Sequence, residues 1–163
     1  FQLIWKTKMK LLCSLITIVL VLSAQTAMAD WISNPSVFMP IYYADQNADV
    51  QKKDGYDHAK LLEHWKKYGL EEGRRSSPVF DVKYYLNKNQ DISKQFGKKN
   101  YKEAAQHWYN TGRKEGRPSH PDFNVRIYLK KNPDVAKTVG AHNYIGAIHH
   151  YVSNGYREGL TAK

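Results

Sequence analysis

Cysteine is almost absent from this sequence. The single thiol, Cys13, lies in a segment that we expect to be removed from the mature protein. A chain without cysteine has no disulfide and no thiolate metal site, so an apolar core must stabilise it. A chain of this length can bury about two thirds of its surface, which makes such a core feasible.

Long hydrophobic runs are also lacking. The longest, Leu11–Leu22, has 12 residues, whereas a membrane-spanning helix needs about 20. The run follows Met9 and precedes a small-residue stretch that ends at Ala29. This order predicts a secretory signal peptide within residues 1–29, with the start at Met9 and cleavage after Ala29. Residues 30–163 would then form one secreted domain, extracellular or periplasmic. An uncleaved membrane anchor is the alternative.

The sequence has no stretch in which β-branched and polar residues alternate, so we expect no β-sheet. It also has no nucleophile elbow, no glycine loop that cradles phosphate and no zinc-ligand spacing. We therefore assign no catalytic residue, metal or other cofactor, and we predict a protein that is not an enzyme.

One phrase occurs three times. It reads HWKKYGLEEGRR from His64, HWYNTGRKEGRP from His107 and HYVSNGYREGLT from His150. The period is 43 residues, which lies in the range of helical arrays. We predict an all-α fold in which three tandem helical repeats, approximately 38–79, 80–122 and 123–163, stack into one small domain.

Each repeat carries the signals of three short helices. Asp81 is placed to cap the first helix, and the NPDV sequence at 132–135 is typical of the start of the second. The second helix of the middle repeat should end at Gly97. Asn100 and Glu103 predict a capping box for the third, and Gly112 is expected to end it as a left-handed cap.

Recurring aromatic residues are the expected core. They are Phe80, Tyr85, Trp65, Trp108, Phe123, Tyr128 and Tyr151. Short helices bury their apolar sides poorly when isolated, so we expect each repeat to pack against its neighbour around a shared core. The ends of such a stack would present apolar faces, which favours self-association.

At these residues the chain resembles a family of tandem repeats from secreted bacterial and some marine animal proteins. Its units read roughly F-D-x-x-Y-Y-L-x-x-N-P-D-V … H-W-x-x-x-G-x-x-E-G-R. The match covers 38–160 and is best in the middle repeat, with FDVKYYLNKNQDI and HWYNTGRKEGR. The third repeat departs from it at Tyr151 and Leu160. The resemblance implies a small helical-repeat domain, often joined to other extracellular modules, and supplies no site residues.

Histidines recur at corresponding positions and are candidate ligands or bases. They are His64, His107, His149 and His150. They come from different repeats and lack a short H-x3-H pair with a nearby acid, so we favour a structural role.

Glutamates recur as well, at Glu72, Glu115 and Glu158. Glycoside hydrolysis needs two carboxylates in different environments, whereas copied repeats give each carboxylate the same one. We expect these glutamates to hold the turn that follows them, for example by pairing with Arg74 or Arg117.

Basic residues outnumber acidic ones by 25 to 15, which favours anionic partners. The chain is also rich in tyrosine. The candidate ligand-binding residues are a partly exposed row of tyrosines with arginines nearby: Tyr42, Tyr84, Tyr109, Tyr156, Arg74, Arg75 and Arg117. Flat rings with a polar edge suit sugars.

This combination predicts a secreted, non-catalytic binding module for an extracellular glycan, such as a polysaccharide, or for a cell-envelope component. A cationic effector that acts on anionic membranes or on a host is the alternative, and a small hydrolase ranks last. We do not expect nucleic acid as the partner, because a secreted protein meets it less often.

Overall fold

The computed structural model describes residues 31–163, so the predicted signal peptide lies outside the described residues. The described part of the chain is all-helical, as predicted. It contains ten α-helices, three π-helical turns and two isolated β-bridges in place of any sheet. Residues 33–163 form one compact body.

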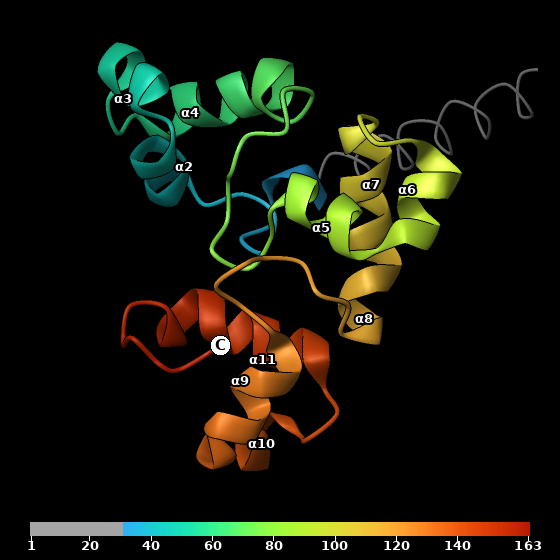
Figure 1. Ribbon diagram of the computed structural model, residues 1–163. Helices are drawn as coiled ribbons and strands as arrows, with labels where there is room; N and C mark the ends of the chain where they lie inside the picture. Colours follow the sequence, from blue (N-terminus) through green and yellow to red (C-terminus); the bar gives the residue numbers. More distant parts are fainter. Residues whose placement is uncertain (1–30) are drawn as a thin grey trace, which may run out of the picture. The chain divides into compact units, whose positions relative to one another are not determined.

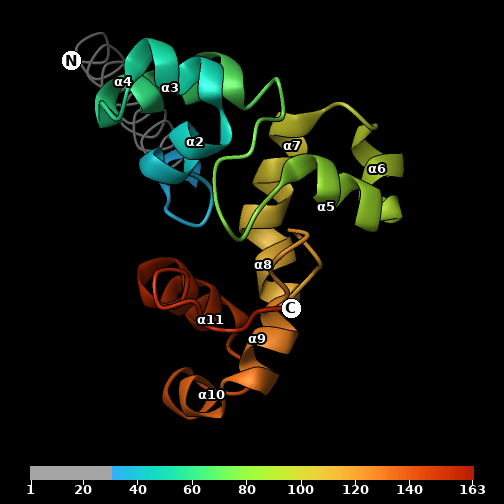
Figure 2. The same cartoon turned by 60° about the vertical axis from the view of Figure 1, so that its left-hand side comes forward.

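The helices form three units of similar composition (Figures 1 and 2). The first unit consists of α2 (Pro40–Gln46), α3 (Ala48–Asp54), α4 (His58–His64) and the π-helical turn η1 (Trp65–Gly69). The second consists of α5 (Val82–Lys88), α6 (Gln90–Phe96), α7 (Tyr101–His107), η2 (Trp108–Gly112) and α8 (Arg113–Glu115). The third consists of α9 (Val125–Lys131), α10 (Pro133–Val139), α11 (Tyr144–His150) and η3 (Tyr151–Gly155). Within each unit the three longer α-helices contact one another.

Several helix boundaries follow from local chemistry. The Asp81 carboxylate accepts a hydrogen bond from the backbone N–H of Tyr84 at 3.0 Å, which caps α5 as predicted. Pro133 occupies the first turn of α10, also as predicted. The capping box of α7 is wrong, because the Asn100 side chain makes no capping bond. Glu103 still lies in the first turn, where the helix dipole favours an acid.

The prediction for Gly112 is wrong. This residue has a right-handed conformation, with φ −58°, and the helix continues through α8. The left-handed cap falls at Gly116, with φ 63° and ψ 38°. There the N–H of Arg117 bonds the carbonyl of Gly112 at 3.0 Å, which is the long bond of a Schellman motif. The π-helical turn and α8 extend the helix beyond the glycine at which the sequence suggested it would stop.

Each unit has its own aromatic cluster. Phe80 stacks on Trp108 with ring centroids 4.3 Å apart and 17° between planes, and Tyr85 packs against Phe80. The corresponding clusters are Phe38, Tyr43 and Trp65 in the first unit and Phe123, Tyr128 and Tyr151 in the third. All seven residues expected in the core are buried. The rings of each of these clusters come from a single unit, and a ring contact between Tyr42 and Tyr156 joins the first unit to the third.

The segments that lead into and out of each unit are tied to one another by backbone hydrogen bonds. Three such bonds are Met39 N to Ser76 O (2.7 Å), Asp81 N to Ser119 O (2.8 Å) and Asn124 N to Ala162 O (2.8 Å). Each bond places the start of a unit beside the segment that leads out of the same unit. These bonds therefore hold the two ends of each unit together.

Candidate binding groove

The recurring histidines bond the recurring tyrosines of their own units. The Tyr85 hydroxyl lies 2.9 Å from His107 Nδ1. Equivalent contacts of 2.8 Å join Tyr43 to His64 and Tyr128 to His150. Burial lowers the pKa of His107 and raises the pKa of Tyr85, so both groups are neutral near pH 7. Among the described residues, no group of histidine, cysteine and acidic side chains is arranged to hold a metal ion.

Two of the three recurring glutamates, Glu72 and Glu115, pair with the arginine two residues later, whereas Leu160 takes that position after Glu158. Arg117 Nε lies 2.5 Å from Glu115, and its Nη1 lies 2.7 Å from Asp91. Arg74 bonds Glu72 and Asp49 in the same way. The hydrogen bond from arginine lowers the pKa of Asp91. Arg74 and Arg117 therefore tie the C-terminal turn of a unit to the start of its second helix, and much of their charge is already neutralised.

A recurring asparagine with a structural role was missed by the sequence analysis. Asn89 Nδ2 donates to the carbonyls of Tyr85 and Pro118 at 2.8 and 3.0 Å, which links the end of α5 to the segment after α8. Asn47 and Asn132 repeat this bridge. The available signal was the first letter of NADV, NQDI and NPDV, which is the same in all three repeats.

The four candidate tyrosines do not form one exposed row. Tyr42 is 7% exposed and packs edge-on against Tyr156, with centroids 5.8 Å apart. Tyr156 is 42% exposed. Tyr109 carries the guanidinium of Arg113 over its ring, 3.5 Å from the centroid. Tyr84 lines a surface hollow, so only Tyr42 and Tyr156 contact each other, and Tyr84 and Tyr109 lie in other surroundings.

Tyr42 is buried because His120 covers it. The Tyr42 hydroxyl lies 3.2 Å from His120 Nε2, and His120 Nδ1 accepts the N–H of Asp122 at 3.1 Å. Because Nδ1 is an acceptor, the proton of the neutral ring is on Nε2, which donates to Tyr42. Burial lowers the pKa of His120 to about 4 and raises the pKa of Tyr42 to about 12.

Two surface hollows adjoin, one on the second unit and one between the first and second units, and both are lined by Lys83 and Asn87. The first, of about 430 Å³, is lined by Lys83, Leu86, Asn87, Gln90, Ser93, Lys94, Lys98 and Tyr101. The second, of about 530 Å³, is lined by Gln46, Asn47, Gly73, Arg74, Arg75, Asp81, Lys83, Tyr84 and Asn87. We call the two together the basic groove.

The charge of the basic groove is strongly positive. Lys83, Lys94 and Lys98 are exposed, and none of the residues that line their hollow is acidic. The single carboxylate that lines the second hollow is Asp81, which is buried and bonded to Arg75 at 2.6 Å. The groove therefore presents the ammonium groups of its lysines to solvent, and Asp81 is the one acid that lines it. Arg74 adds little, because it is already paired with Asp49 and Glu72. The lysines form a surface that attracts anions.

Aromatic and amide groups accompany these charges. The Lys83 ammonium lies 5.6 Å from the centre of the Tyr101 ring, and Tyr84 lines the adjoining hollow. Asn87 and Gln90 supply amides that both donate and accept hydrogen bonds. Of the candidates from sequence, Arg74, Arg75 and Tyr84 lie in this groove, whereas its lysines and Tyr101 were missed.

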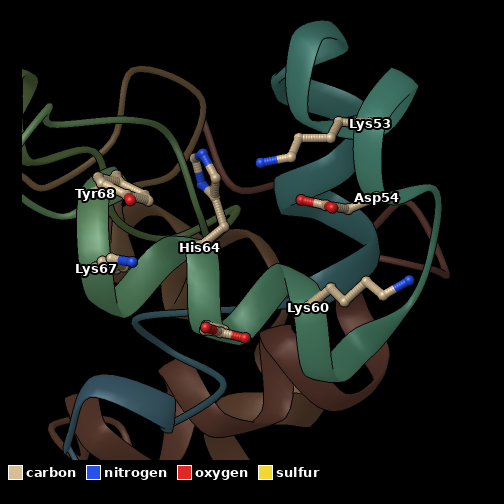
Figure 3. Close-up of a pocket in the computed structure, with 7 residues that line it drawn as sticks. Lys53, Asp54, Lys60, His64, Lys67 and Tyr68 are labelled. Carbon is tan, nitrogen blue, oxygen red and sulfur yellow. The ribbon is translucent and has the colours of Figure 1, made fainter.

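A smaller hollow of about 180 Å³ in the first unit is less suited to an anion. Figure 3 shows the Lys53 ammonium and the Asp54 carboxylate beside this hollow, with His64 and Tyr68 at its opposite side. Its three lysines are opposed by Asp54 and Glu63. The second unit lacks the acid of this hollow. Its equivalent of Asp54 is Phe96, and the Phe96 ring packs against His107.

No protein-family model, curated protein or solved structure matches this chain. The resemblance to a tandem-repeat family therefore stays a prediction from sequence. In residues 31–163, the helices are too short and polar for any to cross a lipid bilayer.

Proposed function

We propose that this protein is a secreted, non-catalytic binding module whose ligand is an anionic extracellular polysaccharide or a similar polyanion of the cell envelope. The observation that carries the proposal is the basic groove. Its exposed lysines lie beside tyrosine rings and amides, with no exposed carboxylate among the lining residues.

These groups match the chemistry of an acidic sugar polymer. Ammonium groups attract its carboxylates, tyrosine rings offer flat faces to sugar rings, and amides bond hydroxyl groups. Each hollow falls in the range of about 300 to 1,000 Å³ that is typical of small-ligand sites. Two adjoining hollows suit a short run of sugar residues better than a single small molecule.

We also propose that the chain is a repeat domain and that it is exported. We infer that the three helical units are copies of one repeat of 43 residues, stacked in a single domain. The recurring tyrosine–histidine contacts and asparagine bridges support this inference. The sequence before Asp30 supports export.

Binding to polygalacturonate, which carries a carboxylate on every sugar ring, tests the proposal. Isothermal titration calorimetry should detect binding at low ionic strength, with dextran as the neutral comparison. Raising the salt from about 10 mM to about 100 mM shortens the screening length from about 30 Å to about 10 Å, and binding should weaken.

Charge reversal in the groove is the matched test. The double variant Lys94→Glu/Lys98→Glu should weaken binding by about tenfold or more, because it replaces attraction with repulsion. Lys130→Glu/Lys131→Glu changes the net charge equally at exposed positions outside the groove and should have an effect of about twofold or less. Equal losses in the two variants, or no binding at low salt, would show that the groove is not the site.

A further inference from the structure

The C-terminal turn of one unit docks against the following unit. Gly73, the left-handed glycine that ends the long helix of the first unit, is buried against Lys83 and Tyr101 of the second. A Cβ atom at Gly73 would lie 2.8 Å from the Lys83 side chain and 2.9 Å from the Tyr101 ring. The contact is close enough that only glycine fits without displacing a neighbour.

The second and third units repeat this contact. A Cβ at Gly116 would lie 2.8 Å from the Tyr144 ring and 3.3 Å from Arg126 Nε. Arg126 also donates from Nη2 to the carbonyl of Glu115 at 2.6 Å and from Nη1 to the Tyr144 hydroxyl at 2.6 Å. A left-handed glycine turn and a receiving pair on the first and third helices therefore form a connection that is used twice.

The turn of the third unit has the same form but makes no such contact. Gly159 has φ 66°, and Leu160 N–H bonds the carbonyl of Gly155 at 2.9 Å, as in the other two turns. Gly159 is exposed, and apart from its two chain neighbours no described residue lies within 4 Å of a Cβ built on it. One turn of the connecting type is thus open to solvent.

The pair of residues in the first unit that would contact such a glycine turn is uncovered as well. By the repeat spacing, Ile41 and His58 correspond to Lys83 and Tyr101. Ile41 is 55% exposed, and both residues line an apolar hollow of about 390 Å³. The other lining residues are Ser33, Pro35, Phe38, Met39, Pro40 and Leu62. The receiving surface therefore has an apolar residue where the second and third units have a cation.

We propose that the Gly159 turn of one copy of this protein docks in the Ile41–His58 hollow of a second copy. The occupant is another copy because this contact would repeat the one that the chain already forms twice between its own units, at Gly73 and at Gly116. Burial of the exposed isoleucine and of the apolar lining supplies the driving force. The two surfaces differ, so the contact is head-to-tail and generates chains or rings of molecules rather than a closed symmetric pair.

Sedimentation equilibrium of the purified protein over a range of concentrations tests this contact. The wild-type protein should form dimers and larger species. Ile41→Glu should weaken association about tenfold or more, because a charge must then be buried. Ile145→Glu is the matched control, since Ile145 is also an exposed isoleucine at the second position of a helix, and it should associate as the wild type does.

Gly159→Asn should weaken association from the opposite surface. Asparagine tolerates the left-handed conformation, and its Cβ has space in the free molecule but would clash in the docked one. A mixture of Ile41→Glu and Gly159→Asn should form one-to-one dimers and nothing larger, because each variant keeps one intact surface. A wild-type protein that stays monomeric, or association that neither substitution weakens, would overturn the proposal.

Discussion

Replacing Gly112 with alanine is expected to destabilise the protein by about 3 kcal/mol. The added Cβ would lie 2.5 Å from the Tyr85 hydroxyl and 3.1 Å from the Trp108 ring. Both neighbours are fully buried, and the hydroxyl is held by its bond to His107. Overpacking at this point therefore strains the aromatic cluster of the second unit. Urea unfolding followed by circular dichroism measures the loss.

A second substitution shows whether the hydroxyl is the cause. Tyr85→Phe alone should cost about 1 kcal/mol, since it removes one hydrogen bond. In the double variant Gly112→Ala/Tyr85→Phe the closest atom is gone, so the total loss should fall below the sum of the single losses by about 1 kcal/mol or more. Strictly additive losses would mean that the glycine is required for another reason.

Lowering the pH from 6.5 to 4 is expected to reduce the free energy of unfolding by about 3 kcal/mol through His120 alone. Burial depresses the pKa of this histidine to about 4 in the folded protein, from 6.5 when it is exposed. Below pH 6.5 the unfolded chain takes up a proton that the folded chain does not accept. The stability that His120 contributes is therefore complete above pH 6.5 and declines as the pH falls toward 4.

Replacement of His120 by asparagine should remove most of this pH dependence. Asparagine can still accept the N–H of Asp122 from its side-chain oxygen, because that contact spans two residues. Thermal unfolding of both proteins between pH 7 and pH 4 measures the difference. His107, whose pKa is also lowered by burial, should account for a smaller remaining slope. An unchanged slope in His120→Asn would place the titrating group elsewhere.

Local sequence signals predicted the helices but not their packing partners. Asp81 and Pro133 mark helix starts because capping depends on a few neighbouring residues. Gly112 was misassigned because its role depends on Tyr85, which lies 27 positions earlier and meets it only in the folded unit. The π-helical turn adds to this error, since it carries the helix past the glycine to Gly116.

In the candidate site, too, the sequence did not show which residues would contact one another. Tyr42 and Tyr84 occupy equivalent positions, yet Tyr42 alone is covered by His120, which is 78 residues away in sequence. The groove lysines were counted in the sequence as part of a dispersed basic surplus. Lys83 and Lys94 come from α5 and α6, and Lys98 from the loop that follows, so their convergence depends on how these elements fold together.

Backbone amide NMR during titration with a short oligogalacturonate tests the proposed binding function most directly. The largest shift changes should cluster at residues of the basic groove, such as Lys83, Asn87, Lys94 and Tyr101, and they should shrink as salt is added. Changes confined to the first-unit hollow around Lys53 and Lys67, or no changes at low salt, would contradict the assignment of this groove as the binding site.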